Sequence, residues 1–486
     1  MTKHYRLLIG GEWVDGEGGT YDIVNPATEQ TVGSAPEASV EQSLAAARAA
    51  QEAFPAWWRT PPAERARLLN AVADKLRERA ADLVPLIISE TGATAMVGSR
   101  MQVPVAIERF ERYAKGAVRD LNIPLAPSPM GATPLAAGGL IGAVVNRQPV
   151  GAVACISPYN FPLVNMAGKI APALAVGCTV VMKPAPQDPL AILELAEIMH
   201  EVGFPPGVVN VVTSSKPGPS VALTETKDID MVSFTGSTVV GEAIFTAGGK
   251  TMKRLLLELG GKGAGLVLSD ANIDVAVGAI ASVWAFHTGQ ICTAPTRAIV
   301  HSSRYDELVS RLAAYAPNLK VGDPTSMDTI VGPVISAAQR GRIESYIAGG
   351  VSEGGELVVD GRRPAHMETG FYVGPTLLAD CKQGMTAVQE EIFGPVVVVV
   401  PFEDDEEGIA IANSTDFGLY DYVFSTDSDR AYRTAKQLRS GNVGINTAQR
   451  NHDSPFGGFK MSGVGRDGGD FGMLAYTEMQ TIVWPG

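Results

Sequence analysis

Hydrophobic and polar residues recur with two different periods along the chain, and these periods predict where helices and strands lie. Apolar residues follow helical spacing from about 39 to 54 and from about 62 to 88, so helices are expected near the start. From Gly151 onward, short β-rich runs alternate with helical segments such as 190–201. The runs are 153–156, 180–182, 208–212 and 231–234. This alternation predicts a parallel sheet covered by helices.

A second α/β region is predicted from near Gly260, with β-rich runs at 266–268, 298–301 and 396–402. Between the two regions, residues 121–149 are rich in Pro and Gly and end in an apolar segment, which predicts a hairpin or an extended arm. The tail from Met473 to Trp484 predicts a terminal strand. Edge strands of this kind often pair between protomers, so the arm and the tail indicate an oligomerisation surface.

Length and composition narrow the classes of function. A chain of 486 residues has room for two or three domains, and 45% hydrophobic with 19% charged residues is typical of a globular protein. The net charge of −13 argues against binding to nucleic acid or to an anionic membrane, because both need a positive field. The N-terminal apolar run is too short for a signal peptide, and no stretch approaches a membrane span, so a cytoplasmic protein is expected.

The cysteines and the familiar ligand motifs exclude several kinds of site. Four widely spaced cysteines form no CxxC pair, so neither a disulfide framework nor a metal site is expected. Residues 463–468 match GxGxxG, but only 18 residues follow, too few for a βαβ unit and its ribose-binding acid. There is no HExxH helix, and the histidines are expected to be structural.

Two segments contain candidate catalytic side chains. Cys292 lies between a Gly turn and a run of small residues, where a substrate could approach the thiol. A free cysteine is more often a small buried hydrophobe than a nucleophile, so this segment alone leaves both interpretations open. Glu258 lies among apolar residues just before two glycines, where desolvation would raise its pKa toward the range of a general base.

Three further segments place polar or small residues at the carboxyl ends of predicted strands, where ligands bind in parallel sheets. Asn160 lies in a loop bracketed by prolines, and Lys183 ends a β-rich run. Gly236 and Ser237 join a strand to a helix, and such a helix N-terminus suits a phosphate. Taken singly, each segment is equally explained as a turn or a cap.

Together and in this order, these segments resemble the aldehyde dehydrogenase superfamily along essentially the whole chain, and segments 389–396 and 454–463 add to the resemblance. The resemblance implies an α/β fold with three parts. A Rossmann-variant dinucleotide-binding domain would comprise residues 1–124 and 150–259, and an α/β catalytic domain with the nucleophile residues 260–460. A small β oligomerisation arm would comprise residues 125–149 and 473–486, and a homodimer or homotetramer is expected.

The resemblance also implies a reaction. Cys292 would attack a small-molecule aldehyde, and the Asn160 amide with the Cys292 backbone N–H would stabilise the oxyanion of the thiohemiacetal. Hydride transfer to NAD(P) would leave a thioester on Cys292. Glu258 would then activate the water that hydrolyses this thioester to a carboxylic acid.

By the same resemblance, Lys183 would contact the adenosine ribose, Gly236 and Ser237 the pyrophosphate, and Glu391 with Phe393 the nicotinamide half of the cofactor. The expected cofactor-binding residues are Ile156, Ser157, Pro158, Lys183, Gly236, Ser237, Leu259, Gly260, Glu391 and Phe393. Pro186 stands where many NAD-preferring members carry a glutamate that repels a 2′-phosphate. NAD is therefore expected, with NADP left open.

Three alternatives share part of this evidence. A coenzyme-A-acylating semialdehyde dehydrogenase would also use Cys292 and Asn160, although such relatives generally lack a glutamate at the position of Glu258. A non-catalytic binding or structural relative would not need these side chains. A thiol hydrolase that uses no nicotinamide would leave Lys183, Ser237 and Glu391 unexplained.

Overall fold

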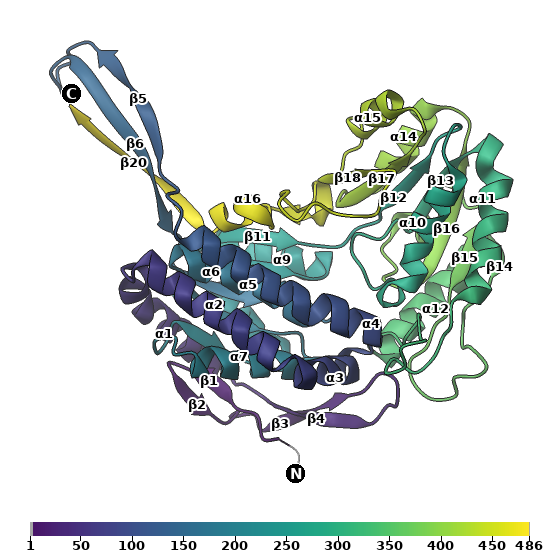
Figure 1. Ribbon diagram of the computed structural model, residues 1–486, viewed down its shortest axis with the longest axis horizontal. Coiled ribbons are helices and arrows are strands. Elements are labelled where there is room, and N and C mark those ends of the chain that lie inside the picture. Colours follow the sequence, from purple (N-terminus) through teal and green to yellow (C-terminus); the bar gives the residue numbers. More distant parts are fainter. Residues whose placement is uncertain (1–2, 486) are drawn as a thin grey trace.

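The computed structural model describes residues 3–485, which form two large sheets with separate hydrophobic cores and a projecting arm (Figure 1). Residues 1–2 and 486, the ends of the predicted ranges 1–124 and 473–486, lie outside the described part. The larger sheet has eight strands in the order β19-β11-β10-β7-β8-β9-β1-β2. Its strands are β1 (Leu7–Ile9), β2 (Glu12–Val14), β7 (Ala152–Ile156), β8 (Thr179–Lys183), β9 (Val209–Val211), β10 (Met231–Thr235), β11 (Arg254–Glu258) and β19 (Gly463–Val464).

The strands from β11 to β9 in this order are parallel, which confirms the predicted α/β sheet, while β19, β1 and β2 pair antiparallel. The strands β7 and β8 are buried along their whole length because helices cover the sheet. The helices of this part are α1 (Val40–Trp58), α2 (Pro62–Glu78), α3 (Ala80–Thr91), α4 (Ala95–Val97), the π-helix Gly98–Gln102, α5 (Val103–Ala117), α6 (Pro162–Val176), α7 (Leu190–Glu201), α8 (Pro217–Glu225) and α9 (Thr238–Gly249). A separate two-stranded sheet contains β3 (Thr20–Val24) and β4 (Thr31–Pro36).

The boundaries of the first helices differ in part from the prediction. The helix α1 begins after Ser39, whose side chain forms a capping box with Gln42. The segment with helical spacing from about 62 to 88 forms two helices, because Arg79 leaves the helical conformation and separates α2 from α3. The Arg79 guanidinium forms an ion pair with the buried Glu194 of α7, a tertiary contact that helical periodicity does not reveal.

The second sheet has seven strands in the order β14-β15-β16-β13-β12-β17-β18, and only β14 pairs antiparallel. Its strands are β12 (Ala264–Val267), β13 (Arg297–His301), β14 (Glu356–Val359), β15 (Thr376–Ala379), β16 (Val396–Phe402), β17 (Tyr420–Phe424) and β18 (Asn442–Ile445). The accompanying helices are α10 (Ile273–Ala285), α11 (Ser302–Tyr315), α12 (Ala337–Ser352), α13 (Thr386–Gln389), α14 (Asp405–Asn413) and α15 (Ser428–Ala435), with short 3-10 turns at His287–Gly289, Ala316–Asn318 and Lys460–Ser462. The second α/β region predicted from the sequence is thereby confirmed.

The arm is a three-stranded antiparallel sheet in the order β20-β6-β5 that extends away from the body (Figure 1). Its strands are β5 (Ile123–Met130), β6 (Gly139–Pro149) and β20 (Thr477–Pro485). The tail strand therefore begins later than predicted, because Met473 belongs to the helix α16 (Gly469–Leu474) and packs, almost fully buried, against Gly116 of α5.

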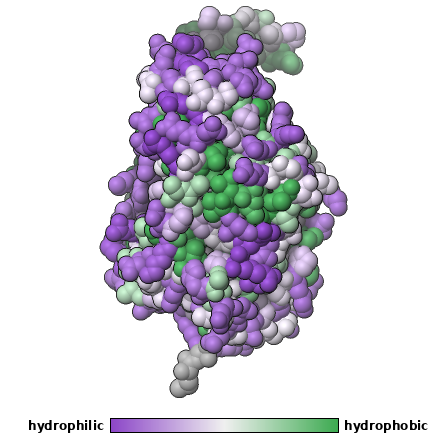
Figure 2. Space-filling model, turned by 90° about the vertical axis from the view of Figure 1, so that its right-hand side faces the viewer, coloured by the Kyte–Doolittle hydropathy of each residue, from purple (hydrophilic) through white to green (hydrophobic). Residues whose placement is uncertain are grey.

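Side chains on the arm are largely exposed, and apolar ones such as Leu140 and Val483 are among them. Figure 2 shows the end of the body that lies away from the arm, which is mostly hydrophilic with a hydrophobic area near its middle. Within residues 3–485, no helix is both long enough and apolar enough to cross a membrane.

Candidate active site

The carboxyl ends of the central strands of the first sheet bring several predicted site residues to one edge. The register pairs Ile156 of β7 with Lys183 of β8 on one side and with Phe234 of β10 on the other. Next to it, Thr235 of β10 pairs with Glu258 of β11. The loops that follow these strands therefore leave the sheet side by side, as in other parallel sheets that bind ligands.

On the β8 side, Lys183 is buried, and its ammonium group donates to the carbonyl oxygens of Pro184 at 2.8 Å and Ser214 at 3.4 Å. Burial lowers the pKa of Lys183 to about 8. The backbone N–H of Ser157 donates to the Lys183 carbonyl at 3.2 Å and ties the loop after β7 to the end of β8. The buried Ser157 hydroxyl finds no hydrogen-bond partner within the described chain. This end of the edge therefore presents one cation and one unsatisfied hydroxyl.

In the middle of the edge, the helix α9 points its N-terminus outward from the end of β10. Ser237 occupies the N-cap position, is exposed, and makes no side-chain capping bond. A Cβ atom on Gly236 would lie 2.4 Å from the Phe234 ring, so only glycine fits this turn. Free N–H groups at a helix N-terminus attract anions, and a phosphate is a suitable ligand here.

The loop after β11 contacts both Glu391 and the cysteine segment. The backbone N–H of Gly261 donates to Glu391 Oε1 at 2.9 Å, and a Cβ atom on Gly260 would lie 2.4 Å from Glu391 Oε2. A Cβ atom on Gly261 would lie 2.4 Å from the carbonyl oxygen of Cys292. Two glycines thus let a carboxylate and the cysteine loop approach the same backbone. Leu259 is buried, and its N–H donates to the Ser462 carbonyl at 3.0 Å.

The cysteine lies just after a tight turn. His287, Thr288 and Gly289 all have positive φ angles, of 48°, 54° and 72°. A Cβ atom on Gly289 would lie 2.2 Å from the Gly394 carbonyl oxygen, so the turn packs directly against the segment that follows Glu391 and Phe393. This strained backbone holds Cys292 at a fixed point between the two sheets' loops.

Asn160 reaches the same turn from the first sheet. Its side-chain Nδ2 donates to the Gln290 carbonyl at 2.8 Å, and its Oδ1 accepts from the Phe161 N–H at 3.0 Å. The Gln290 side chain is itself buried and accepts from the Ile335 N–H at 3.0 Å. Gln290 therefore helps to position Asn160 and the cysteine loop. The sequence did not indicate this role, because no pattern distinguishes Gln290 from its neighbours in the cysteine segment.

The thiol and the two carboxylates act on one another electrostatically. Cys292 is partly exposed, and burial of its sulfur, followed by the charge of Glu391, raises the pKa of the thiol to about 12. Glu258 and Arg450 also influence this pKa, Glu258 raising and Arg450 lowering it. Burial raises the pKa of Glu391 to about 7.

Glu258 is 4% exposed, and neither carboxylate oxygen has a hydrogen-bond partner within residues 3–485. Burial, with the nearby Asp467, raises the pKa of Glu258 well above its usual value. A Cβ atom on Gly457 would lie 2.7 Å from Glu258 Oε1, so this glycine leaves the carboxylate its space. Gly457 is a second residue that the sequence analysis did not single out.

The remaining predicted residues complete the same edge. Phe393 has a φ angle of 59°, and its ring meets that of Tyr159 edge-on at 5.9 Å between centroids. Pro158 precedes Tyr159 and is half-buried, and Ile156 is buried at the end of β7. Lys183 is separated from β11 by two strands of the sheet and has no hydrogen bond to the cysteine loop, so it belongs to the far end of the edge.

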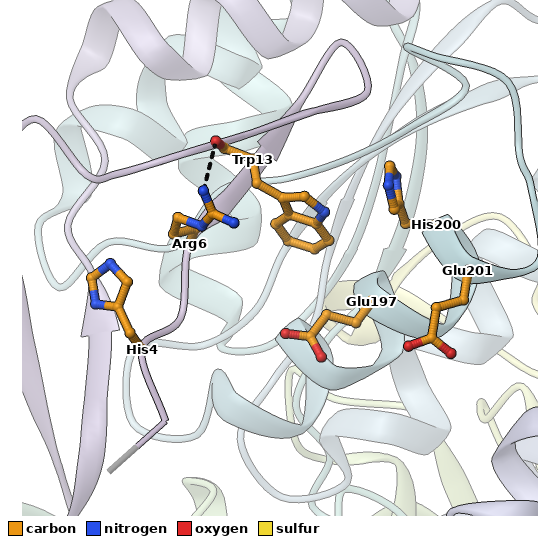
Figure 3. Close-up of a pocket in the computed structure, with 6 residues that line it drawn as sticks. All are labelled: His4, Arg6, Trp13, Glu197, His200 and Glu201. Atoms are coloured by element: carbon orange, nitrogen blue, oxygen red, sulfur yellow. Dashed lines mark hydrogen bonds between the residues drawn. The ribbon is translucent and has the colours of Figure 1, made fainter. Parts of the chain in front are cut away.

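A different pocket, of about 240 Å³, lies at the surface between the N-terminal strands and α7 (Figure 3). Its lining residues are His4, Arg6, Trp13, Glu197, His200 and Glu201. In this view the Arg6 guanidinium donates to the Trp13 carbonyl at 3.4 Å. None of the predicted site residues lines this pocket, and its lining contains no cysteine.

Comparison with known proteins identifies the family. The model of the "Aldehyde dehydrogenase family" matches residues 13–482. A 3-succinoylsemialdehyde-pyridine dehydrogenase from Pseudomonas sp is 37% identical over 99% of both chains. A chloroplastic betaine aldehyde dehydrogenase from Beta vulgaris is 36% identical over 98% of this chain and 95% of that protein.

Solved structures agree with these relatives. A betaine aldehyde dehydrogenase from Staphylococcus aureus, crystallised with NAD+, superposes with a TM-score of 0.94 at 34% identity and covers 99% of this chain and 95% of that one. An NAD+ complex of an aldehyde dehydrogenase from Bacillus cereus gives a TM-score of 0.92 at 36% identity, covering 99% and 97%. The chain belongs to the aldehyde dehydrogenase family, which confirms the resemblance found in the sequence.

Proposed function

We propose that this protein oxidises an aldehyde to a carboxylic acid, with NAD+ as hydride acceptor and water as the acyl acceptor. One observation carries the proposal. The Asn160 amide, the Cys292 thiol and the unpartnered Glu258 carboxylate come from three distant parts of the sequence and belong to one site. Such a set supplies an oxyanion donor, a nucleophile and a base, which are the groups that acyl transfer through a thiol needs.

The residues at the first-sheet edge fit a dinucleotide. Lys183 offers a buried ammonium group, the α9 N-terminus that begins at Ser237 has no side-chain cap, and Glu391 offers a carboxylate near Cys292. When bound, NAD+ supplies the acceptor for the hydride that leaves the substrate carbon. Pro186 provides no carboxylate against a 2′-phosphate, so NADP is part of the same test.

The chain's own residues perform the remaining chemistry. The Cys292 sulfur bonds to the aldehyde carbon, and the former carbonyl oxygen becomes an oxyanion that accepts hydrogen bonds from Asn160 Nδ2 and the Cys292 N–H. Because burial keeps the pKa of the thiol near 12, its proton must pass to a neighbouring base as the bond forms. After hydride loss the carbon is a thioester.

Glu258 is proposed to complete the cycle. Its carboxylate takes a proton from a water molecule whose oxygen bonds to the thioester carbon. The carbon–sulfur bond then breaks, the acid is released, and the sulfur leaves as the thiolate. A carboxylate without hydrogen-bond partners and with a raised pKa is suited to accept and hold that proton.

We also propose that the arm joins two copies of this chain, and that the protein is cytoplasmic. The arm's exposed apolar side chains and the open outer edge of β5 support pairing with another protomer. Sedimentation of the wild type beside a variant truncated before Thr477 tests the association, and cell fractionation tests the location.

A panel of aliphatic, aromatic and ω-carboxy aldehydes, each assayed with NAD+ and with NADP+, tests the main proposal. Cys292→Ala is expected to abolish oxidation of every aldehyde while still binding the cofactor in a calorimetric titration, because nucleophile and dinucleotide edge are different groups. Product analysis with and without coenzyme A separates hydrolysis from acyl transfer. Retained turnover in Cys292→Ala would contradict the assignment of the nucleophile.

A further inference from the structure

Two arginines on opposite sides of the segment around Asn160 and Cys292, Arg109 and Arg450, have no acidic partner in a chain with a net charge of −13. Within residues 3–485, neither Arg109 nor Arg450 forms an ion pair with a carboxylate. The neighbouring Arg112, by contrast, is paired with Glu108 and Asp453. Two unneutralised guanidinium groups at one site create a local positive field that attracts an anion.

Arg450 lies on an aromatic surface that starts at the cysteine loop. The Tyr422 hydroxyl donates to the Thr293 carbonyl at 2.7 Å, directly after Cys292, and its ring stacks on Tyr420 at 4.8 Å. Phe456 packs against the same cluster, and the Arg450 guanidinium lies 3.7 Å from the Phe456 ring centroid. Arg450 is exposed, so a ligand can reach it.

Arg109 approaches from the opposite element, α5. Its Nη1 donates to the Val164 carbonyl at 3.0 Å, in the first turn of α6 that follows Asn160. A Cβ atom on Gly168, one turn further along α6, would lie 1.7 Å from the same Nη1. The absence of a side chain at Gly168 is therefore what admits this guanidinium.

The two guanidinium groups act on each other, and Arg450 also acts on the thiol. Desolvation lowers the pKa of Arg450, the charges of Cys292, Tyr420 and Asp467 raise it, and that of Arg109 lowers it. Arg450 thus lies within electrostatic range of the space beside Cys292, and Arg109 lies within electrostatic range of Arg450. The cofactor residues are attached to other strand ends, so this space lies on the substrate side of the sulfur.

Resting on the proposed function, we infer that Arg109 and Arg450 bind a carboxylate at the far end of the aldehyde, so that the substrate is an ω-carboxy aldehyde. A planar guanidinium matches a carboxylate with two parallel hydrogen bonds. The aromatic surface between Arg450 and the thiol covers the methylene groups that separate the two ends. A cationic aldehyde would meet two like charges in the same space.

The test compares kcat/KM for succinic and glutaric semialdehyde with that for their methyl esters and for betaine aldehyde, a cation. We expect the wild type to prefer the better of the two acids over its ester by about 10- to 100-fold, the range for a hydrogen bond to a charged group. We expect Arg450→Gln and Arg109→Gln to move this ratio toward one, mainly through the KM of the acid. Arg67→Gln, which removes a surface charge paired with Glu64, should keep the wild-type ratio.

Two glycine-to-alanine substitutions distinguish a specific effect on the acid-to-ester ratio from a loss of folding. Gly168→Ala should lower the acid-to-ester ratio as Arg109→Gln does, because the new Cβ displaces the guanidinium. Gly278→Ala is the control, since a Cβ atom there would meet nothing within 4 Å. Thermal melting of each variant shows whether it is folded.

Oxidation of the esters or of betaine aldehyde as efficiently as of the acids would overturn the inference and leave the proposed dehydrogenase intact. An unchanged ratio in folded Arg109→Gln and Arg450→Gln would also overturn it. If no aldehyde is oxidised at all, the proposed function itself fails.

Discussion

Replacing Glu258 with glutamine tests two properties of this carboxylate: its role as the base in thioester hydrolysis and the cost of burying its charge. Glutamine has the shape of glutamate, and the carboxylate makes no hydrogen bond within the described residues, so the exchange breaks no contact. It removes a base that typically contributes 10²–10⁴-fold, which corresponds to about 3–5 kcal/mol in the barrier to thioester hydrolysis. The variant retains Cys292 and Asn160, which act in the attack on the aldehyde and before the hydride transfer. These two steps should therefore slow far less than hydrolysis.

The assay is stopped-flow detection of the reduced cofactor. We expect Glu258→Gln to give a rapid burst of about one reduced cofactor per active site, followed by a steady rate lower by about 10²–10⁴-fold. The thioester that accumulates during the burst should be detectable as a mass increase on Cys292. A progress curve without a burst, at the wild-type steady rate, would refute the reasoning.

The same variant should change stability with a defined sign. The folded protein raises the pKa of Glu258 above its unfolded value, so the folded state binds the proton more tightly. Wild-type stability is then highest below the unfolded pKa and falls as the pH rises toward the folded pKa, and a tenfold difference in proton affinity between the two states corresponds to about 1.4 kcal/mol. Urea unfolding should therefore show the stability of Glu258→Gln rising relative to that of the wild type as the pH increases above the unfolded glutamate pKa of about 4.3. A constant difference across this range would mean that the carboxylate is not destabilised by burial.

Two further substitutions test other parts of the site. Asn160→Ala removes the donor that now holds the Gln290 carbonyl, and we expect kcat to fall by about 10²–10³-fold with an unchanged cofactor Kd, measured by steady-state kinetics and fluorescence titration; a loss below threefold would argue against the oxyanion role. Arg297→Met should lower the free energy of unfolding by about 3–5 kcal/mol, because the buried guanidinium donates to the carbonyls of Lys262, Ile411 and Ala412. Chemical denaturation measures this loss, and a change below about 1 kcal/mol would contradict it.

Local patterns predicted most of the architecture. The strands β7, β8, β10 and β16 and the helix α7 agree with their predicted ranges to within a residue or two, because each is a strongly periodic or continuously apolar segment. The family was identified from motifs that are short but ordered along the chain. The predicted residues Ile156, Lys183 and Glu258 come to one sheet edge because the carboxyl ends of parallel strands meet there.

Close approaches between distant segments could not be predicted in this way. Gly168 has no local role in α6, and only the position of Arg109 on another helix shows why a side chain is missing. Gly263, directly before β12, lies where a Cβ atom would be 2.5 Å from the Ala294 carbonyl oxygen and 2.8 Å from that of Tyr420. Arg79, at the break between α2 and α3, likewise forms an ion pair with Glu194 of α7. Each is a tertiary contact, and single-sequence periodicity carries no information about tertiary contacts.

The edge strand β19 has a consequence for how the protein is made. The outer edge of β11 pairs with Gly463 and Val464, and the space beside Glu258 is bounded by Gly457, so both are completed by residues that are synthesised long after β11. Until then the nascent chain exposes the unpaired hydrogen-bonding groups of a hydrophobic strand, a template for aggregation that chaperones bind. A chain that stops before Gly457 would lack both this strand and the glycine beside Glu258, so we expect such a truncated copy to be inactive.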